Sequence, residues 1–204
     1  MIDKILYYKL NPILNCFLEK LDSNIVKELY KTLDFVKFIN ENIFLNLSNS
    51  KWESQVNNWI SERGPVRLPW DSSTVCIGIA SEAITVFNSA TKPWKIPLIV
   101  RNKNGEKIVN ILVKFEDVRK DKLTMIVSKF LNNICKGLVD IETYNIFPVY
   151  ETCGWIEMVE KSSTMYDIKH KYKTTLQNYI MDLNPNITVK KMREKFIKTC
   201  VSSC

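Results

Sequence analysis

The segment that most constrains the fold covers residues 108–134, where an apolar run ends in a lysine, passes through an acidic turn and continues as an amphipathic pattern. Ile108, Ile111 and Val113 form a β-rich run that ends at Lys114. Apolar residues then recur at helical spacing on one face, at Leu123, Val127, Phe130, Leu131 and Ile134. The pattern predicts a strand followed by a helix packed behind it.

This strand–turn–helix layout is typical of nucleotide binding. A lysine fixed at the end of a strand can reach phosphate oxygens as a point charge, and a carboxylate on the helix, Asp121, can orient the lysine or the ligand. Periodicity alone also fits a simpler interpretation, a surface lysine on an edge strand followed by an ordinary core helix.

Composition predicts a globular, reduced, cytoplasmic protein. The chain has 204 residues with 46% hydrophobic content, which is enough to bury a core. Its six cysteines are scattered without a C-x-x-C pair, and His170 is the only histidine. We therefore expect mostly buried thiols and no metal site. Lys4 and Lys9 interrupt the apolar N-terminus, and nowhere do 18 apolar residues run together, so we expect neither secretion nor a membrane span.

The net charge of +7 is concentrated in residues 168–198. This segment carries eight Lys or Arg against Asp182 and Glu194, a net charge of +6. Peripheral contact with an anionic membrane is one interpretation, and solvated helix faces are the other, which we favour. No nucleic-acid motif is present, so we expect no specific nucleic-acid partner.

The sequence pattern of residues 1–63 predicts helices. Asp22 or Ser23 can cap a helix that starts at Asn24, with a break near Asp34. The apolar side of this helix is expected at Ile25, Leu29, Leu33, Val36 and Phe38. A second helical pattern, which includes Trp52, ends at Gly64-Pro65.

The sequence pattern of residues 74–114 predicts strands. Two short strands are expected around residues 80–82, and a turn at Asn104-Gly105 joins the strands 96–100 and 108–114. Further on, Thr188 can cap the last of two helices predicted at 172–183 and 188–204.

The run KFEDVRKDKLTMIVSKFLNNI resembles the lysine strand and following helix of phosphatidylinositol 3- and 4-kinases, with the pattern K-x-G-D-D-x-R-Q-D-x-L. The matching positions are Lys114, Asp117, Arg119, Asp121 and Leu123. The chain departs from the pattern by one missing residue before Arg119, by Glu116 in place of the glycine and by Lys120 in place of the glutamine. The resemblance implies that Lys114 contacts phosphate and that Asp121 is an orienting carboxylate.

Two more motifs follow the same family order. Ser89, Ala90 and Lys92 resemble the S-A-x-K phosphate loop, most closely the form of the type III phosphatidylinositol 4-kinases, although a hairpin turn with a solvated lysine also fits. CGWIEMV resembles the G-x-I-E-x-V hinge, whose main chain binds the adenine edge. The implied nucleotide-binding residues of the hinge are Glu157, Met158 and Val159. Tyr144 takes the place of a tyrosine on the inner wall of the adenine pocket, although a half-buried strand tyrosine fits equally well.

Beyond the hinge, SSTMYDI resembles the family's linker and FIKTCVSSC a helix of its second lobe. The resemblance implies an α+β fold, a kinase-like N-lobe with an antiparallel sheet and one packed helix. The expected parts are a helical lead-in (1–64), the N-lobe (65–159) and an incomplete helical C-lobe (160–204).

The resemblance further implies ATP as the cofactor. The D-R-H-x-x-N and D-F-G motifs, which supply the base and the magnesium ligands, are not in this sequence, so we expect a lipid-kinase-like lobe that is inactive alone. Its expected partner is a complementary C-lobe or a host kinase-related protein. The alternative is a non-catalytic pseudokinase or interaction module.

Overall fold

The computed structural model describes residues 16–43, 48–80, 84–135, 138, 140–159, 162–186 and 188–203. These residues form two compact units that divide between Phe115 and Glu116. The fold is α+β with antiparallel strand pairing, as predicted. The expected three-part division stays a prediction, and the part of the lead-in at 1–15 and 44–47 lies outside the described residues.

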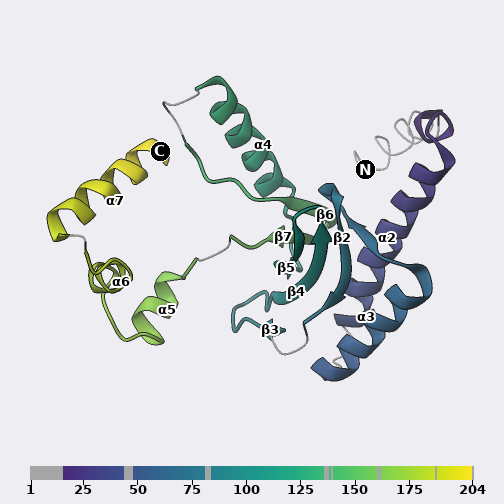
Figure 1. The fold of residues 1–204 in the computed structure, drawn as a ribbon, viewed down its shortest axis with the longest axis horizontal. Helices are drawn as coiled ribbons and strands as arrows, with labels where there is room; N and C mark the ends of the chain where they lie inside the picture. Colours follow the sequence, from purple (N-terminus) through teal and green to yellow (C-terminus); the bar gives the residue numbers. More distant parts are fainter. Residues whose placement is uncertain are drawn as a thin grey trace. The chain divides into compact units, whose positions relative to one another are not determined.

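In the described part of the first unit, the helices α2 and α3 accompany an antiparallel sheet (Figure 1). The elements are α2 (Ser23–Ile43), α3 (Asn49–Arg63), β1 (Val66–Leu68), β2 (Asp71–Ile79), β3 (Thr85–Val86), β4 (Trp94–Asn102) and β5 (Gly105–Lys114). Strands β1, β2, β4 and β5 are neighbours in that order, and β3 pairs with β4. Helix α3 packs on β2, and α2 packs on β1.

The β4–β5 hairpin is the core of this sheet. Its turn lies at the predicted position, and Gly105 has φ 112°, a value that side-chain-bearing residues rarely adopt. Ile96 pairs with Ile111, and both side chains are fully buried. On the same face Trp94 stacks on Trp52 of α3, with ring centroids 6.1 Å apart. The face that carries Ile111 is therefore the core face.

Helix α2 differs from its prediction in length and in its buried side. Asp22 Oδ1 accepts the N–H of Asn24 at 2.7 Å, but the helix continues past Asp34. Ile25 and Leu29 are 55% and 42% exposed, and Leu33 is exposed as well. The buried apolar residues are Phe35, Val36, Ile39 and Ile43. The prediction placed most of the buried side in the first turns of α2, whereas the buried apolar residues lie in its C-terminal part.

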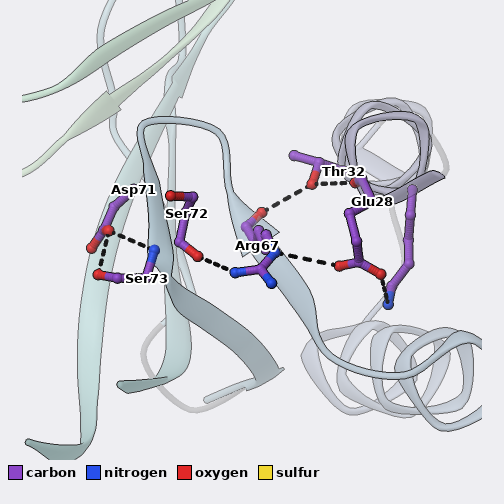
Figure 2. Close-up of polar contacts among 7 residues, drawn as sticks. Glu28, Thr32, Arg67, Asp71, Ser72 and Ser73 are labelled. Atoms are coloured by element: carbon purple, nitrogen blue, oxygen red, sulfur yellow. Dashed lines mark hydrogen bonds and ion pairs between the residues drawn. The ribbon is translucent and has the colours of Figure 1, made fainter. Parts of the chain in front are cut away.

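A polar network connects α2 to the first two strands (Figure 2). Thr32 Oγ1 lies 3.0 Å from Glu28 O and 3.3 Å from Arg67 O. Arg67 Nε lies 3.6 Å from Glu28 Oε2, and Arg67 Nη1 donates to Ser72 O. The network borders a cavity of about 700 Å³ between α2 and the β1–β2 turn. Arg67 therefore connects the lead-in helix to the sheet.

The second unit contains one hairpin and four helices in its described part (Figure 1). The elements are α4 (Arg119–Ile134), β6 (Ile146–Tyr150), β7 (Cys153–Glu157), α5 (Met165–His170), α6 (Leu176–Leu183) and α7 (Val189–Ser203). Helix α5 begins inside the stretch expected to be a linker, because Thr164 Oγ1 accepts the N–H of Asp167 at 3.0 Å and caps it. Thr188 Oγ1 accepts the N–H of Lys191 in α7, as predicted.

Helix α4 presents its apolar face to solvent, which contradicts the predicted core helix. Leu123 and Phe130 are each 61% exposed, and Ile134 is 62% exposed. Its buried side is polar, because Ser128 is buried and the side chain of Asn132 makes two hydrogen bonds with the main chain of Ile141. The Asn132 bonds attach this side of α4 to the segment that precedes β6.

Candidate functional site

The predicted phosphate loop is a tight turn between β3 and β4. Lys92 N–H donates to Ser89 O at 3.1 Å, and Ser89 N–H donates to Phe87 O at 3.0 Å. Lys92 has φ 41°, in the left-handed region. Both Ser89 and Lys92 are exposed. Because the Ser89 N–H is already used inside the loop, Ser89 can offer its hydroxyl to a ligand, and Lys92 can offer its ammonium.

Strand register places this loop beside Lys114. Trp94, the first residue of β4, pairs with Val113, the residue before Lys114 in β5. Lys92 precedes Trp94 by two residues, so the loop and Lys114 lie at the same end of two neighbouring antiparallel strands. The first unit thus brings together the two lysines that were predicted to contact phosphate.

Lys114 does not point into the core formed with α3. Side chains alternate between the faces of a strand, so Lys114 shares a face with Leu112 and Asn110. These three residues are partly exposed, whereas Val113 and Ile111 on the other face are fully buried. A half-exposed lysine at a strand end, beside an exposed turn, can contact an anionic group without displacing the core.

The hinge is held by Asn145, the residue before β6, and Glu157, the last residue of β7. Glu157 N–H donates to Asn145 O at 2.8 Å. The Glu157 carboxylate accepts from Asn145 in return, with Oε2 3.2 Å from the main-chain N and 2.6 Å from the side-chain Nδ2. Tyr144, the neighbour of Asn145, is half-buried and precedes β6 rather than lying within it. The second unit thus holds Tyr144 and residues 157–159 at the same end of one hairpin.

Lys129 and Asn145 belong to this site and were not predicted. Lys129 Nζ donates to Asn145 Oδ1 at 3.1 Å, which links α4 to the hinge. Only the register of the β6–β7 hairpin shows that Asn145 lies opposite Glu157, so no sequence signal indicated this pair.

The acidic turn before α4 is organised by Asp117. Its carboxylate accepts the N–H of Arg119 at 3.0 Å and two guanidinium bonds at 2.9 Å each. These bonds from Arg119 lower the pKa of Asp117 to about 2. Asp121 lies in the first turn of α4 and is exposed, where its charge favours the helix N-terminus.

The predicted site residues therefore form two local groups. Ser89, Lys92 and Lys114 are in the first unit. Asp121, Tyr144, Glu157, Met158 and Val159 are in the second. The convergence of both groups on one cleft stays a prediction. In the described part of the chain, no three His, Cys, Asp or Glu side chains are grouped so that they could hold a metal ion, and no helix is long and apolar enough to cross a membrane.

Comparison with known proteins shows distant similarity to lipid kinases. The chain is 24% identical to phosphatidylinositol 3-kinase pik3 of Schizosaccharomyces pombe, over 67% of this chain and 18% of that protein. It is 29% identical to phosphatidylinositol 3-kinase piki-1 of Caenorhabditis elegans, over 68% of this chain and 9% of the relative. It is 26% identical to phosphatidylinositol 4-phosphate 3-kinase C2 domain-containing subunit beta of Homo sapiens, over 74% of this chain and 10% of the relative. No family model matches.

These similarities support a relationship to the phosphatidylinositol 3-kinases. The matches span less than a fifth of each relative's length. The predicted resemblance to phosphatidylinositol kinases is thus confirmed at the level of a distant relationship, whereas a special closeness to the type III 4-kinases stays a prediction.

Proposed function

We propose that this chain carries the ATP-binding segments of a phosphatidylinositol-kinase-like phosphotransferase. The observation that carries the proposal is the local geometry of the three motifs, which occur in family order. The Ser89/Lys92 turn lies beside the end of the strand that carries Lys114, and the hinge main chain is held at residue 157. Distant similarity to phosphatidylinositol 3-kinases supports the same conclusion.

The residues present fit a nucleoside triphosphate. Lys92 and Lys114 would hold phosphate oxygens as point charges, with the Ser89 hydroxyl as an additional donor. The main chain of residues 157–159 would read the adenine edge, and Tyr144 would line the pocket. Asp121 would orient Lys114 or the ligand. We further propose a 4-kinase-like phosphate loop, because residues 89–92 read S-A-T-K.

The proposed activity of this 204-residue polypeptide is nucleotide binding without phosphoryl transfer. Transfer needs a residue that accepts the hydroxyl proton and carboxylate or amide ligands for magnesium. The D-R-H-x-x-N and D-F-G motifs that would supply these groups do not occur in the sequence.

A nucleotide titration with and without magnesium tests the proposal. Weak binding of an ATP analogue, with similar affinity in magnesium and in EDTA, is the expected result. A control with adenosine should bind more weakly, because it lacks the phosphates that Lys92 and Lys114 hold. The absence of ATP binding at millimolar concentration would refute the nucleotide-binding function.

An interaction module derived from a lipid kinase is the second candidate function. It is favoured by the exposed apolar face of α4, which includes Leu123 and Phe130. Exposed apolar patches of this kind mark protein interfaces, and a complementary second lobe or a kinase-related host protein would cover it. Folded protein that binds no nucleotide would favour this candidate.

We also propose a cytoplasmic protein in which the basic segment 168–198 forms solvated helix faces or, as the alternative, contacts anionic membranes peripherally. The basic side chains described there are exposed, as Lys169 and Arg193 illustrate. Sedimentation with phosphatidylserine vesicles should show binding that weakens as salt is raised. Equal sedimentation with neutral vesicles would contradict this membrane contact.

A further inference from the structure

The contacts of Asn145 exceed those of an ordinary hairpin residue. Asn145 and Glu157 share three hydrogen bonds, two through the Asn145 main chain and one from its side chain, Nδ2 to Glu157 Oε2 at 2.6 Å. An ordinary antiparallel pair would use main-chain groups only, whereas here the Glu157 carboxylate accepts two of the three bonds. The side-chain bond adds a charge-assisted contact, which is stronger than a bond between neutral groups.

The orientation of the Asn145 amide is fixed from both sides. Lys129 Nζ lies 3.1 Å from Oδ1, and a lysine ammonium can only donate. Glu157 Oε2 lies near Nδ2, and a carboxylate can only accept. Lys129, Asn145 and Glu157 therefore form a short chain of hydrogen bonds in which each residue donates to the next. The chain runs from Lys129 on α4 to Glu157 at the end of β7.

We propose that Asn145 is the positioning residue of the hinge, which holds Glu157 so that the main chain of residues 157–159 is fixed in the conformation that selects adenine over guanine. This inference rests on the proposed function. Asn145 acts on the nucleotide only through Glu157, and Lys129 orients Asn145.

Selectivity follows from the order of donor and acceptor along the hinge. A main-chain carbonyl followed by an N–H matches adenine, which presents an amino donor beside a ring-nitrogen acceptor. Guanine presents a carbonyl acceptor beside an N–H donor, so a fixed main chain leaves both pairs mismatched. A rigid set of hydrogen-bonding groups discriminates between bases because mismatched groups that the bound base shields from water stay unpaired. A loosened hinge can adjust to either base.

The test uses Asn145→Asp, which keeps the size of the side chain but replaces the Nδ2 donor with a second carboxylate oxygen. This oxygen would face Glu157 and repel it. The double variant Asn145→Asp with Glu157→Gln restores the side-chain bond with donor and acceptor exchanged, but its amide nitrogen cannot also accept the N–H of residue 145, as Glu157 Oε2 does. Asn178→Asp, on the exposed surface of α6, is the matched control. ATP and GTP affinities are measured for each, together with thermal unfolding and amide hydrogen exchange of residues 157–159 without nucleotide.

The expected result for Asn145→Asp is a loss of ATP affinity of about tenfold or more, with a smaller loss for GTP. Amide exchange of residues 157–159 should become faster. The double variant regains the side-chain bond but not the acceptor for the N–H of residue 145, so it should recover part of the ATP affinity and selectivity, and Asn178→Asp should behave like the wild type. The unfolding curve identifies a variant that fails to fold. In that case the double variant is compared with the wild type instead.

Three outcomes would overturn the inference. If Asn145→Asp bound ATP with unchanged affinity and selectivity, only the inference would fail and the proposed function would stand. The same holds if the double variant remained as impaired as the single one, because the Asn145–Glu157 bond would not be the cause. If the wild type bound no ATP, the proposed function would fail and the inference with it.

Discussion

Gly154 of β7 lies directly against Val118 at the start of α4. A Cβ atom on Gly154 would overlap Val118 Cγ2 and would lie 3.2 Å from Phe147 O. Val118 is fully buried, so it has little room to move. The glycine of the hinge motif is therefore required for packing between α4 and the hairpin. Its φ angle is not in the left-handed region, and conformational freedom does not explain it.

Gly154→Ala should destabilise the protein by about 1–3 kcal/mol, as expected for overpacking in a rigid core. Denaturant unfolding of the variant measures this loss. Val118→Ala removes the methyl groups that the new Cβ would meet, so the double variant should be less destabilised than the sum of the single variants, by about 0.5 kcal/mol or more. Additive single effects would show that Val118 is not the obstacle.

Local chemistry made several elements predictable. The Asn104-Gly105 turn and the alternation in β5 could be predicted because both depend on residues only a few positions apart in the sequence. The buried side of α2 was predicted correctly at Val36 and wrongly at Ile25, Leu29 and Leu33, and that of α4 was predicted wrongly. An apolar stripe such as Leu123 and Phe130 indicates that a helix has an apolar side, but it does not show whether that side is buried, and in α4 both residues are exposed. The Asn145–Glu157 pair could not be predicted, because it depends on hairpin register.

Polar substitutions on the apolar face of α4 should have little effect on stability. Leu123→Gln combined with Phe130→Gln changes two side chains that are each 61% exposed, so the free energy of unfolding should change by about 0.5 kcal/mol or less per site. Binding of a hydrophobic dye should decrease. Ile146→Ala, at a residue 1% exposed, is the control and should cost about 2–5 kcal/mol. A similar loss in the α4 variant would place its apolar face in a core.

Asp117 should make stability depend on pH in the acid range. Its pKa is lowered from 3.8 to about 2 by the side chain and then the N–H of Arg119. The folded state thus holds the proton less tightly than the unfolded state, so this contribution is complete above pH about 4 and is lost as the pH falls towards 2. Asp117→Asn should be less stable than the wild type at pH 7, with a difference that closes by pH 2.

Denaturant midpoints at a series of pH values measure the effect of Asp117. In an Arg119→Gln background, the further change Asp117→Asn should lose most of its effect, because the guanidinium bonds are gone. An Asp117→Asn effect that is equally large at pH 2 and pH 7 would mean that charge is not its cause.

The cysteines should differ strongly in reactivity. Burial raises the pKa of the Cys76 thiol to about 12 and that of Cys153 to about 11, whereas Cys16 is exposed. Because the thiolate is the nucleophile, iodoacetamide at pH 8 should modify Cys16 first and reach Cys76 and Cys153 only after unfolding. Peptide mass mapping after timed alkylation measures this order. Equal rates for Cys16 and Cys76 in the native protein would contradict the buried position of Cys76.

Lys114→Met should reduce the affinity for an ATP analogue at least about tenfold while the fold stays intact, because a charge that faces phosphate is replaced by an apolar chain of similar length. Lys92→Met should have the same direction of effect, since its turn lies beside the same strand end. Lys103→Met is the matched control, because Lys103 lies in the turn at the opposite end of β5, about 30 Å away along the strand.

Calorimetric titration of the three variants, with circular dichroism to verify folding, separates a local phosphate contact from a general loss of positive charge. All three variants lose one charge, so equal reductions would indicate nonspecific electrostatic attraction. A selective loss in Lys114→Met and Lys92→Met requires that both ammonium groups reach the same phosphates. Unchanged affinity in Lys114→Met would show that this lysine does not contact the phosphates. The pairing of Trp94 with Val113 would then have only a structural role.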